Sequence, residues 1–188
     1  ADDGDRLRVG GRSGRREVVA DVHAAGLAGA ALPLVARAGI ELAAHGVPLK
    51  LAVNTPVSAL VNLPIAQMLR EERPRSAGWP GLILEVTEDE IVKDLDVANE
   101  VANELRAHNC TLAIDDFGAG YSSLARLRQL PFSELKIDRA YITACDHDRT
   151  NADVIEVIVE LAQRFGLKTV AEGIETTHES HKLQGIGC

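Results

Sequence analysis

The stretch "LAIDDFGAGYSSL", residues 112–124, places an apolar run directly before two adjacent carboxylates and a turn that contains Gly118 and Gly120. An apolar run of this kind is typical of a buried strand, so Asp115 and Asp116 should stand at its carboxyl end. Each of two neighbouring carboxylates raises the cost of ionising the other. The pair therefore indicates either a bound cation or a structural role in a turn or helix cap.

Strand-type runs alternate with amphipathic helical segments along most of the chain. We expect strands at 49–54, 82–86, 111–115, 134–138 and 168–172, and helices at 27–45, 64–73, 93–108, 152–165 and 176–184. Strands rich in Leu, Ile and Val, separated by helices, indicate an α/β fold with a parallel sheet. Successive strand ends lie about 30 residues apart, a period that fits both a (β/α) barrel and a doubly wound sheet.

A polar side chain closes each of the five expected strands. These side chains are Asn54, Glu85, Asp115, Lys136 and Glu172. In a barrel the carboxyl ends of the strands form a ring around one centre, whereas in an open sheet they form a line. Five polar strand ends therefore favour the barrel, with these side chains clustered at one rim.

The amide and carboxylate oxygens at the strand ends suit Mg²⁺, Mn²⁺ or Ca²⁺ better than zinc or copper. Because neighbouring strand residues point to opposite faces, Asp115 and Asp116 can share a site only if the strand ends between them. Gly118 and Gly120 would permit that turn. Two cations and the positive charge of Lys136 would together favour metal-assisted phosphodiester hydrolysis.

Each signal also has a purely structural interpretation. Two adjacent aspartates are common in turns and caps, and a lone lysine is commonly salt-bridged. Glu85 and Glu88 could begin a helix, and Asn54 could cap one. His178 and His181 are expected to face solvent on the last helix rather than to bind a metal. The recurrence of polar residues at all five strand ends is what favours a shared site.

Composition limits the classes of function. The 188 residues carry a net charge of −8, which argues against a basic surface for nucleic acid or anionic lipid. Three cysteines without metal-site spacing and the lack of a long apolar run predict a cytoplasmic protein without a membrane segment. Residues 1–16, rich in Gly and Arg, are expected to be a flexible lead-in to one domain at 17–188.

Five motifs closely resemble the EAL domain family, the bacterial cyclic di-GMP phosphodiesterases. They are "LAVN" (51–54), "LEVTE" (84–88), "DDFGAGYSSL" (115–124), "LKIDR" (135–139) and "VAEGIET" (170–176). The resemblance implies a TIM-like (β/α)8 barrel of the EAL type that opens cyclic di-GMP to linear pGpG with two Mg²⁺ or Mn²⁺ ions. The partner it implies is cyclic di-GMP rather than a nucleic acid polymer, in a homodimer or beside further signalling domains of a parent protein.

The resemblance also assigns a role to each matching residue. Asn54, Glu85 and Asp115 would bind the first metal, and Asp115 would bridge to a second metal that Asp116 also binds. Lys136 would lie beside the nucleophilic water and Glu172 near the second metal, so Lys136, Glu172 and Asp116 are the expected catalytic residues. Glu88 would stabilise the loop that runs from Asp116 to Ser123.

The sequence departs from the family pattern at both ends. It contains no Glu-Ala-Leu tripeptide, which carries a further metal-binding Glu, and it ends at Cys188 before the Gln of the last family strand. We therefore expect an incomplete barrel, truncated or degenerate at both ends, that hydrolyses cyclic di-GMP slowly or not at all as written. The alternative is a degenerate EAL domain that acts as a cyclic di-GMP receptor or protein-interaction module without turnover.

Overall fold

The computed structural model describes residues 7–10, 17–20, 28–47, 49–62, 64–72, 79–87, 95–118 and 132–188. The chain divides into two compact units. The first comprises Ala1–Val86 and Asp94–Leu112, and the second comprises Thr87–Lys93 and Ala113–Cys188. Asn54 and Glu85 lie in the first unit, and Asp115, Asp116, Lys136 and Glu172 lie in the second.

Among its described residues, the first unit contains four strands and four helices. The strands are β1 (Leu7–Gly10), β2 (Glu17–Ala20), β3 (Lys50–Asn54) and β4 (Leu82–Thr87), and the helices are α1 (Ala28–Ala44), α2 (Val57–Asn62), α3 (Ile65–Glu72) and α5 (Leu95–Arg106). Strand β2 pairs antiparallel with β1 and parallel with β3, and β3 pairs parallel with β4. The parallel pairs place the carboxyl ends of β3 and β4 at one edge.

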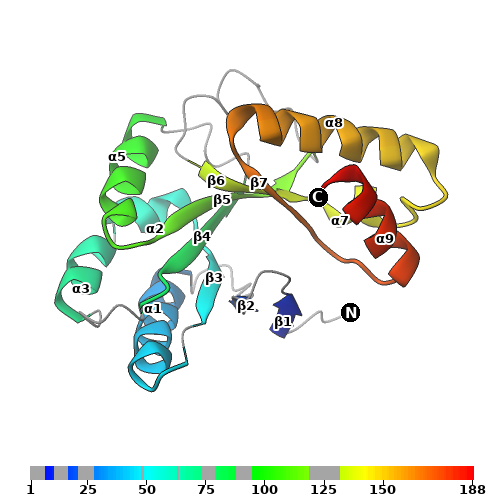
Figure 1. Cartoon of the computed structure of the whole chain (residues 1–188). Helices are drawn as coiled ribbons and strands as arrows, with labels where there is room; N and C mark the ends of the chain where they lie inside the picture. Colours follow the sequence, from blue (N-terminus) through cyan, green and yellow to red (C-terminus); the bar gives the residue numbers. More distant parts are fainter. Residues whose placement is uncertain are drawn as a thin grey trace. The chain divides into compact units, whose positions relative to one another are not determined.

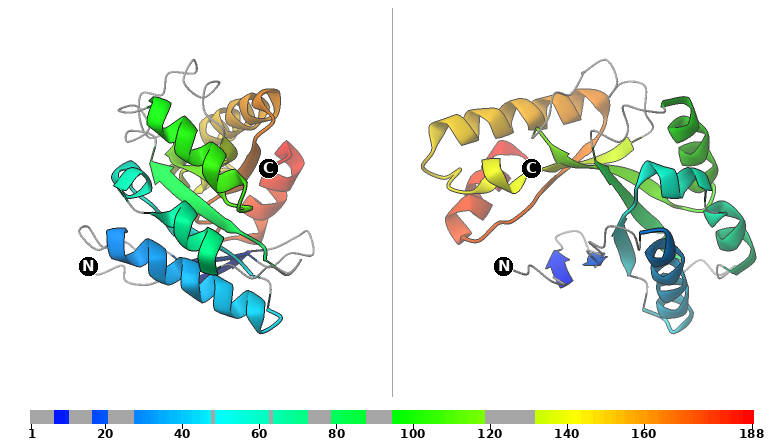
Figure 2. Two further views of the ribbon diagram at one scale, coloured as in Figure 1. Left: turned by 90° about the vertical axis from the view of Figure 1, so that its left-hand side faces the viewer. Right: turned by 180° about the vertical axis from the view of Figure 1, so that it is seen from behind.

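Helices cover the strands of the first unit. Helix α1 packs against β3 and α3, while α2 and α3 pack against α5 (Figure 2). Because strands buried on both faces read as continuous apolar runs, the buried Leu51, Ala52 and Val53 of β3 fit this arrangement. Strand β4 is likewise buried from Leu82 to Val86, including the carboxylate-bearing Glu85.

Contacts between Trp79 and the end of the α5 segment fix the start of β4. The Trp79 indole donates a hydrogen bond to the carbonyl of His108 at 2.9 Å, and the Asn109 amide donates to the carbonyls of Trp79 and Pro80 at 3.3 and 3.2 Å. Gly81, the residue before β4, has a φ of +85° and lies against the backbone of Asn109. The close approach leaves no room for a side chain at this position.

Among its described residues, the second unit contains three helices and three strands, the first of which begins at Thr111 of the first unit. The strands are β5 (Thr111–Phe117), β6 (Phe132–Ile137) and β7 (Lys168–Ala171), and the helices are α7 (Arg139–Ile142), α8 (Arg149–Phe165) and α9 (Thr177–Ile186). Strands β6 and β7 are parallel, with Lys136 opposite Val170 and Ile137 opposite Ala171. The two side chains of each pair therefore point to the same face, with Lys136 and Val170 on one face and Ile137 and Ala171 on the other.

Helix α8 covers β6 and β7 (Figure 1). Its buried residues recur at helical spacing: Ala152, Ile155, Ile158, Val159 and Ala162. Asp148 caps the first turn by accepting hydrogen bonds from the backbone of Thr150 and Asn151, and Gly166, with a φ of +71°, ends the helix. The sequence thus specifies both ends and the buried face of α8.

The predicted α/β class is confirmed, and each of the five expected strands and five expected helices has a counterpart. Strands β1 and β2 and the short helices α2 and α7 were not predicted, and β1 lies within the expected lead-in 1–16. The domain boundary at residue 17 stays a prediction. Among the described residues, the structure contains no helix of sufficient length and apolar character to cross a membrane.

We predict that Gly81→Ala destabilises the protein far more than Gly46→Ala. Both glycines have a positive φ, which costs about 1–2 kcal/mol for a residue with a Cβ. A Cβ at Gly81 would also overlap the Asn109 carbonyl, whereas a Cβ at Gly46 would meet nothing within 4 Å. Urea unfolding should show a loss of about 3 kcal/mol or more for Gly81→Ala. Equal losses for the two variants would contradict the close approach of Gly81 and Asn109.

Candidate metal centre

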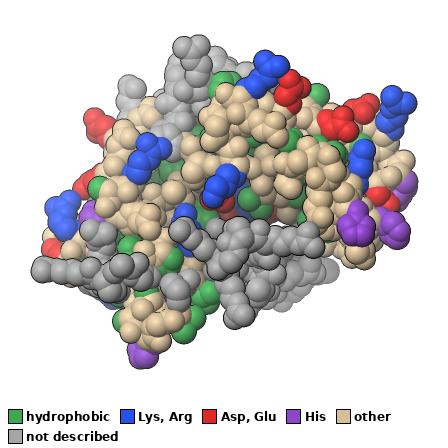
Figure 3. Space-filling model, viewed as in Figure 1, with side chains coloured by type: hydrophobic (Ala, Val, Ile, Leu, Met, Phe, Trp, Pro, Cys, Tyr) green, Lys and Arg blue, Asp and Glu red, His purple; other side chains and the backbone are tan. Residues whose placement is uncertain are grey.

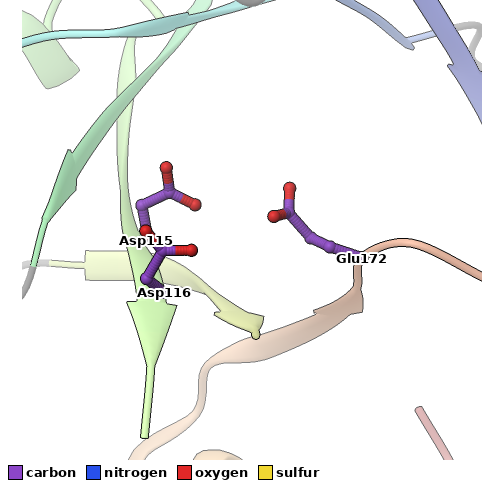
Figure 4. Close-up of side chains that lie close together, drawn as sticks. All are labelled: Asp115, Asp116 and Glu172. Atoms are coloured by element: carbon purple, nitrogen blue, oxygen red, sulfur yellow. The ribbon is translucent and has the colours of Figure 1, made fainter. Parts of the chain in front are cut away.

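Three carboxylates gather in the second unit, at the ends of β5 and β7. Oxygen atoms of Asp115, Asp116 and Glu172 all lie within 4.8 Å of one another. Figure 4 shows the two aspartates of β5 and Glu172, which directly follows β7, with their side chains turned toward the same space. These three predicted site residues are therefore brought together.

Lys136 of β6 lies between two of these carboxylates. Its Nζ is 2.8 Å from Asp115 Oδ1 and 2.7 Å from Glu172 Oε1. The side chains of Lys136 and Asp115 are 7% and 9% exposed, and that of Glu172 is 25% exposed. An ion pair with so little exposure is weakly screened by water and salt, so the lysine holds both carboxylates in defined positions.

Strand register explains how Lys136 reaches Glu172. Lys136 pairs with Val170 of β7, and a residue two positions further along a strand points to the same face. Glu172 occupies that position just beyond the strand, where its backbone N–H donates to the carbonyl of Ile137 at 3.3 Å. The parallel pairing thus delivers both side chains to one face.

Asp116 reaches the same space as Asp115 through its own backbone. The sequence predicted that the strand would end between the two aspartates, with glycines making the turn, and this part of the prediction was wrong. Strand β5 continues to Phe117, and Asp116 itself has a φ of +53°. This left-handed conformation, which Asp tolerates better than most residues, interrupts the alternation of side chains along the strand.

The surroundings of Asp116 disfavour its charged form in the absence of a cation. Partial removal of water from its carboxylate, together with repulsion from Asp115, Asp138 and Glu172, raises the pKa of Asp116 to about 6. A hydrogen bond with the Asp138 side chain acts in the same direction. A divalent cation would reverse this balance by attracting the carboxylates that now repel one another.

Asn54 and Glu85 form a second pair of predicted ligands, in the first unit. They are register partners at the ends of the parallel strands β3 and β4, so their side chains point to the same face. The backbone of the following residue, Thr55, donates to the Glu85 carbonyl at 2.7 Å. Glu85 is buried, with 4% of its surface exposed. The metal-binding roles of Asn54 and Glu85 stay predictions.

Other predictions fall outside the cluster. Glu88, the expected loop-stabilising residue, lies outside the described residues. His178 and His181 are exposed on α9, as predicted, and Figure 3 shows His side chains at the surface near this helix. Asp138 was not singled out from the sequence, although an Asp directly before a short helix is a recognisable cap. It accepts a hydrogen bond from the backbone of Ala140 at 2.7 Å.

The donors of the second-unit cluster fit a hard divalent cation. All three are carboxylates, and carboxylate oxygen is the ligand that Mg²⁺, Mn²⁺ and Ca²⁺ prefer. Partial burial and the neighbouring carboxylates raise the pKa of Asp116, and a cation bound there would favour its charged form. Lys136 already supplies one positive charge between Asp115 and Glu172, which leaves Asp116 as the carboxylate with the greatest need of another.

Comparison with known proteins gives a consistent family relationship. The EAL domain model matches residues 10–188. The bifunctional diguanylate cyclase/cyclic di-GMP phosphodiesterase MucR of Pseudomonas aeruginosa is 40% identical over 139 residues, which cover 73% of this chain and 20% of MucR. The cyclic di-GMP phosphodiesterase RocR of the same organism is 35% identical over 149 residues, or 79% of this chain and 38% of RocR. The chain thus spans well under half the length of these curated relatives.

Solved structures show the same relationship. The EAL domain of Mycobacterium smegmatis DcpA superposes with a TM-score of 0.79 at 30% identity, over 98% of this chain and 84% of that EAL domain chain. A cyclic di-GMP complex of the MucR phosphodiesterase gives a TM-score of 0.73 at 29% identity, over 93% and 80%. A manganese and cyclic di-GMP complex of Klebsiella pneumoniae BlrP1 gives a TM-score of 0.72 at 26% identity, over 92% of this chain and 48% of the BlrP1 chain. The expected fold, an α/β barrel of the EAL type that is incomplete in this chain, is confirmed.

We predict that Mn²⁺ affinity rises with pH up to about 6 and then levels off. Below its pKa of about 6 in the metal-free protein, Asp116 must release a proton before it can bind a cation. The affinity should therefore change by up to about tenfold per pH unit between pH 5 and 6. Calorimetric titrations in buffers of different ionisation enthalpy measure the proton released. If the Mn²⁺ affinity of Asp116→Asn depends on pH as it does in the wild type, a group other than Asp116 titrates.

We predict that Lys136→Met lowers the stability of the metal-free protein by about 3–5 kcal/mol at pH 7.5, because it leaves buried Asp115 without its cationic partner. Mn²⁺ should recover more stability in this variant than in the wild type. Lys182→Met is the matched control, since Lys182 is partly exposed and lies 3.7 Å from Glu156. Its loss should stay within about 0.5 kcal/mol. Similar urea midpoints for both variants would contradict the structural role of Lys136.

Proposed function

The chain belongs to the EAL domain family, and on this premise we propose that it is a cyclic di-GMP phosphodiesterase domain that opens its substrate to linear pGpG. The observation that carries the proposal is the buried Lys136 between Asp115 and Glu172, with Asp116 beside them. Clustered carboxylates around one fixed positive charge suit the displacement of a phosphate ester with the help of divalent cations.

The relatives support the choice of substrate and metal. MucR and RocR carry cyclic di-GMP phosphodiesterase in their names, and solved structures of MucR and BlrP1 contain cyclic di-GMP. The BlrP1 complexes contain manganese or calcium. We propose Mg²⁺ or Mn²⁺ for this chain, since the carboxylate donors fit these ions as well as calcium.

Asp115, Asp116 and Glu172 would hold the cation in this proposal. When bound, divalent cations supply Lewis acidity toward the phosphate and make water a nucleophile at neutral pH. Asp115 and Asp116 bring oxygens to the cluster from consecutive positions of β5. Lys136 holds Asp115 and Glu172 at fixed positions, so the site is organised before the substrate arrives.

The reaction consumes one water molecule for each phosphodiester bond opened. The water oxygen forms the new bond to phosphorus, and the bond to the 3′ oxygen of the substrate breaks. The water loses its proton to solvent, and the departing 3′ oxygen receives a proton from solvent, while Glu172 stays paired with Lys136. The Lys136 ammonium lies beside Glu172 and can offset negative charge that develops on the phosphate.

A second candidate is a cyclic di-GMP receptor or interaction module without turnover. The observation that favours it is that none of the 188 residues forms a Glu-Ala-Leu tripeptide, the motif that carries a further metal-binding Glu in the family. A cation that must replace an anionic ligand with water binds more weakly and fixes the nucleophile less well. The phosphodiesterase and the receptor would both bind cyclic di-GMP, but the receptor would not hydrolyse it.

We further propose a cytoplasmic location and assembly as a homodimer or with other signalling domains. The three cysteines are free thiols, which suits a reducing compartment. The relatives are several times longer than the matched region, so the EAL domain is one part of each. Gel filtration with light scattering would test the dimer directly.

We predict that a longer chain, which supplies a Glu-Ala-Leu strand before residue 1 and a Gln-containing strand after Cys188, forms pGpG at least about a hundredfold faster than the 188-residue chain. The reason is that a displacement of about 1 Å in such a site can cost on the order of 10²-fold in rate. The measurement is pGpG formation from cyclic di-GMP in Mn²⁺, resolved by chromatography.

Asp116→Asn in the longer chain is the control and should abolish most of the activity. Rapid turnover by the 188-residue chain, or full activity of Asp116→Asn, would show that the metal site is wrongly assigned. Tight cyclic di-GMP binding by a correctly folded longer chain that forms no pGpG would instead support the receptor.

A further inference from the structure

The short helix α7 contacts the segment that carries Asp116. The Tyr141 hydroxyl donates a hydrogen bond to the carbonyl of Gly118 at 2.7 Å. Gly118 has a φ of +101°, and a Cβ there would lie 2.9 Å from the Tyr141 ring. The ring therefore packs directly on the backbone two residues beyond Asp116, where the left-handed φ of Asp116 redirects the chain.

The same helix contacts the segment that carries Glu172. Arg139, its first residue, forms an ion pair with Glu175. Its side chain also packs against Gly173, which has a φ of +69° and no room for a Cβ. Both contacts fall within three residues of Glu172. One end of α7 thus meets the segment after β7, and Tyr141 meets the end of β5.

Glu179 of α9 ties this second segment to the turn after α7. One carboxylate oxygen accepts from the backbone of Ala144 at 2.9 Å, and the other accepts from Glu175 and Thr176 at 3.0 and 2.9 Å. These three donors lower the pKa of Glu179 to about 2. Thr176 completes a capping box by accepting from the Glu179 backbone at 3.1 Å. Ala144 has a φ of +63°.

We propose that residues Asp138–Ala144 form a clamp that sets the separation between Asp116 and Glu172, with Tyr141 and Glu179 as positioning residues on its two sides. The proposal rests on the proposed function, because the separation matters for a cation held by both carboxylates. Neither residue needs to touch the cation. Tyr141 acts through Gly118, and Glu179 acts through the backbone of residues 144, 175 and 176.

Electrostatics explains the need for a clamp. Asp115, Asp116 and Glu172 carry like charges within 4.8 Å, and they repel one another when no cation is bound. Lys136 holds Asp115 and Glu172 together, so Asp116 is the carboxylate that repulsion would displace. Without a further restraint Asp116 would move away from Glu172, and a cation would have to bring it back at the expense of its binding energy. The clamp keeps the oxygens close together in advance.

Three variants of the full 188-residue chain test the clamp. Tyr141→Phe removes one hydroxyl on the Asp116 side, and Glu179→Gln replaces one acceptor oxygen on the Glu172 side. Glu71→Gln is the matched control, because the exposed Glu71 carboxylate accepts from Gln67 at 3.0 Å within α3 of the first unit and takes no part in the clamp. The readouts are amide hydrogen exchange in the metal-free protein and the Kd for Mn²⁺.

We expect each positioning variant to speed amide hydrogen exchange on the side of the clamp that it contacts. Tyr141→Phe should speed exchange at residues 116–118 about threefold to tenfold, and Glu179→Gln should do so at Glu172, whose N–H bonds to Ile137. Both should raise the Mn²⁺ Kd by a similar factor. Amides of Ile158 and Val159 in α8 should keep their protection, and Glu71→Gln should match the wild type.

Faster exchange in α8 as well would mean a general loss of stability and would overturn the clamp. Unchanged exchange at residues 116–118 in Tyr141→Phe would also overturn the clamp. If Glu179→Gln does not fold, the exchange of Tyr141→Phe is sufficient to test the clamp. An unchanged Mn²⁺ Kd in both variants would refute the link to metal binding. A wild type that binds no Mn²⁺ would contradict the proposed function, while the exchange pattern would still decide the clamp.

Discussion

The site in the second unit depends on the ammonium group of Lys136. It lies 2.8 Å from Asp115 and 2.7 Å from Glu172, and it is nearly excluded from water. A lysine in this environment would be costly without its partners, and the carboxylates would repel one another without the lysine. Parallel pairing of β6 and β7 supplies the geometry, since it puts Lys136 opposite Val170 and Glu172 one pleat further along. The arrangement is stable only as a group of opposite charges.

Lys136 pairs with Asp115 and Glu172, and Asp116 lies beside this group of charges. Asp116 is therefore the carboxylate that would gain most from a bound cation. Partial burial of its carboxylate, followed by repulsion from Asp115, Asp138 and Glu172, raises the pKa of Asp116 to about 6, and a bound cation would favour the charged form. Its left-handed backbone turns it toward the same space as Asp115. Contacts from α7 and Glu179 hold the segments beyond β5 and β7. A divalent cation would therefore bind at a site whose carboxylate-bearing segments are already held in position.

The sequence predicted much of this because apolar runs and polar strand ends are local signals. The five strands and the gathering of Asp115, Asp116 and Glu172 follow from apolar runs that each end in a polar residue. The way Asp116 joins the site could not be predicted, since a positive φ at an aspartate depends on the packing around it. Helix α7 was missed because four residues are too few for a helical period. The contact of Tyr141 with Gly118 joins residues 23 apart and has no local signature.

The central claim is that Asp115, Asp116 and Glu172 hold a divalent cation beside Lys136. The most direct measurement is anomalous diffraction from crystals of the chain soaked in Mn²⁺. The account predicts a manganese peak within about 2.5 Å of carboxylate oxygens of Asp115 and Asp116, with Lys136 still paired to a carboxylate. A fully occupied manganese site that involves none of the three carboxylates, or none at all at millimolar Mn²⁺ in a well-ordered crystal, would contradict it.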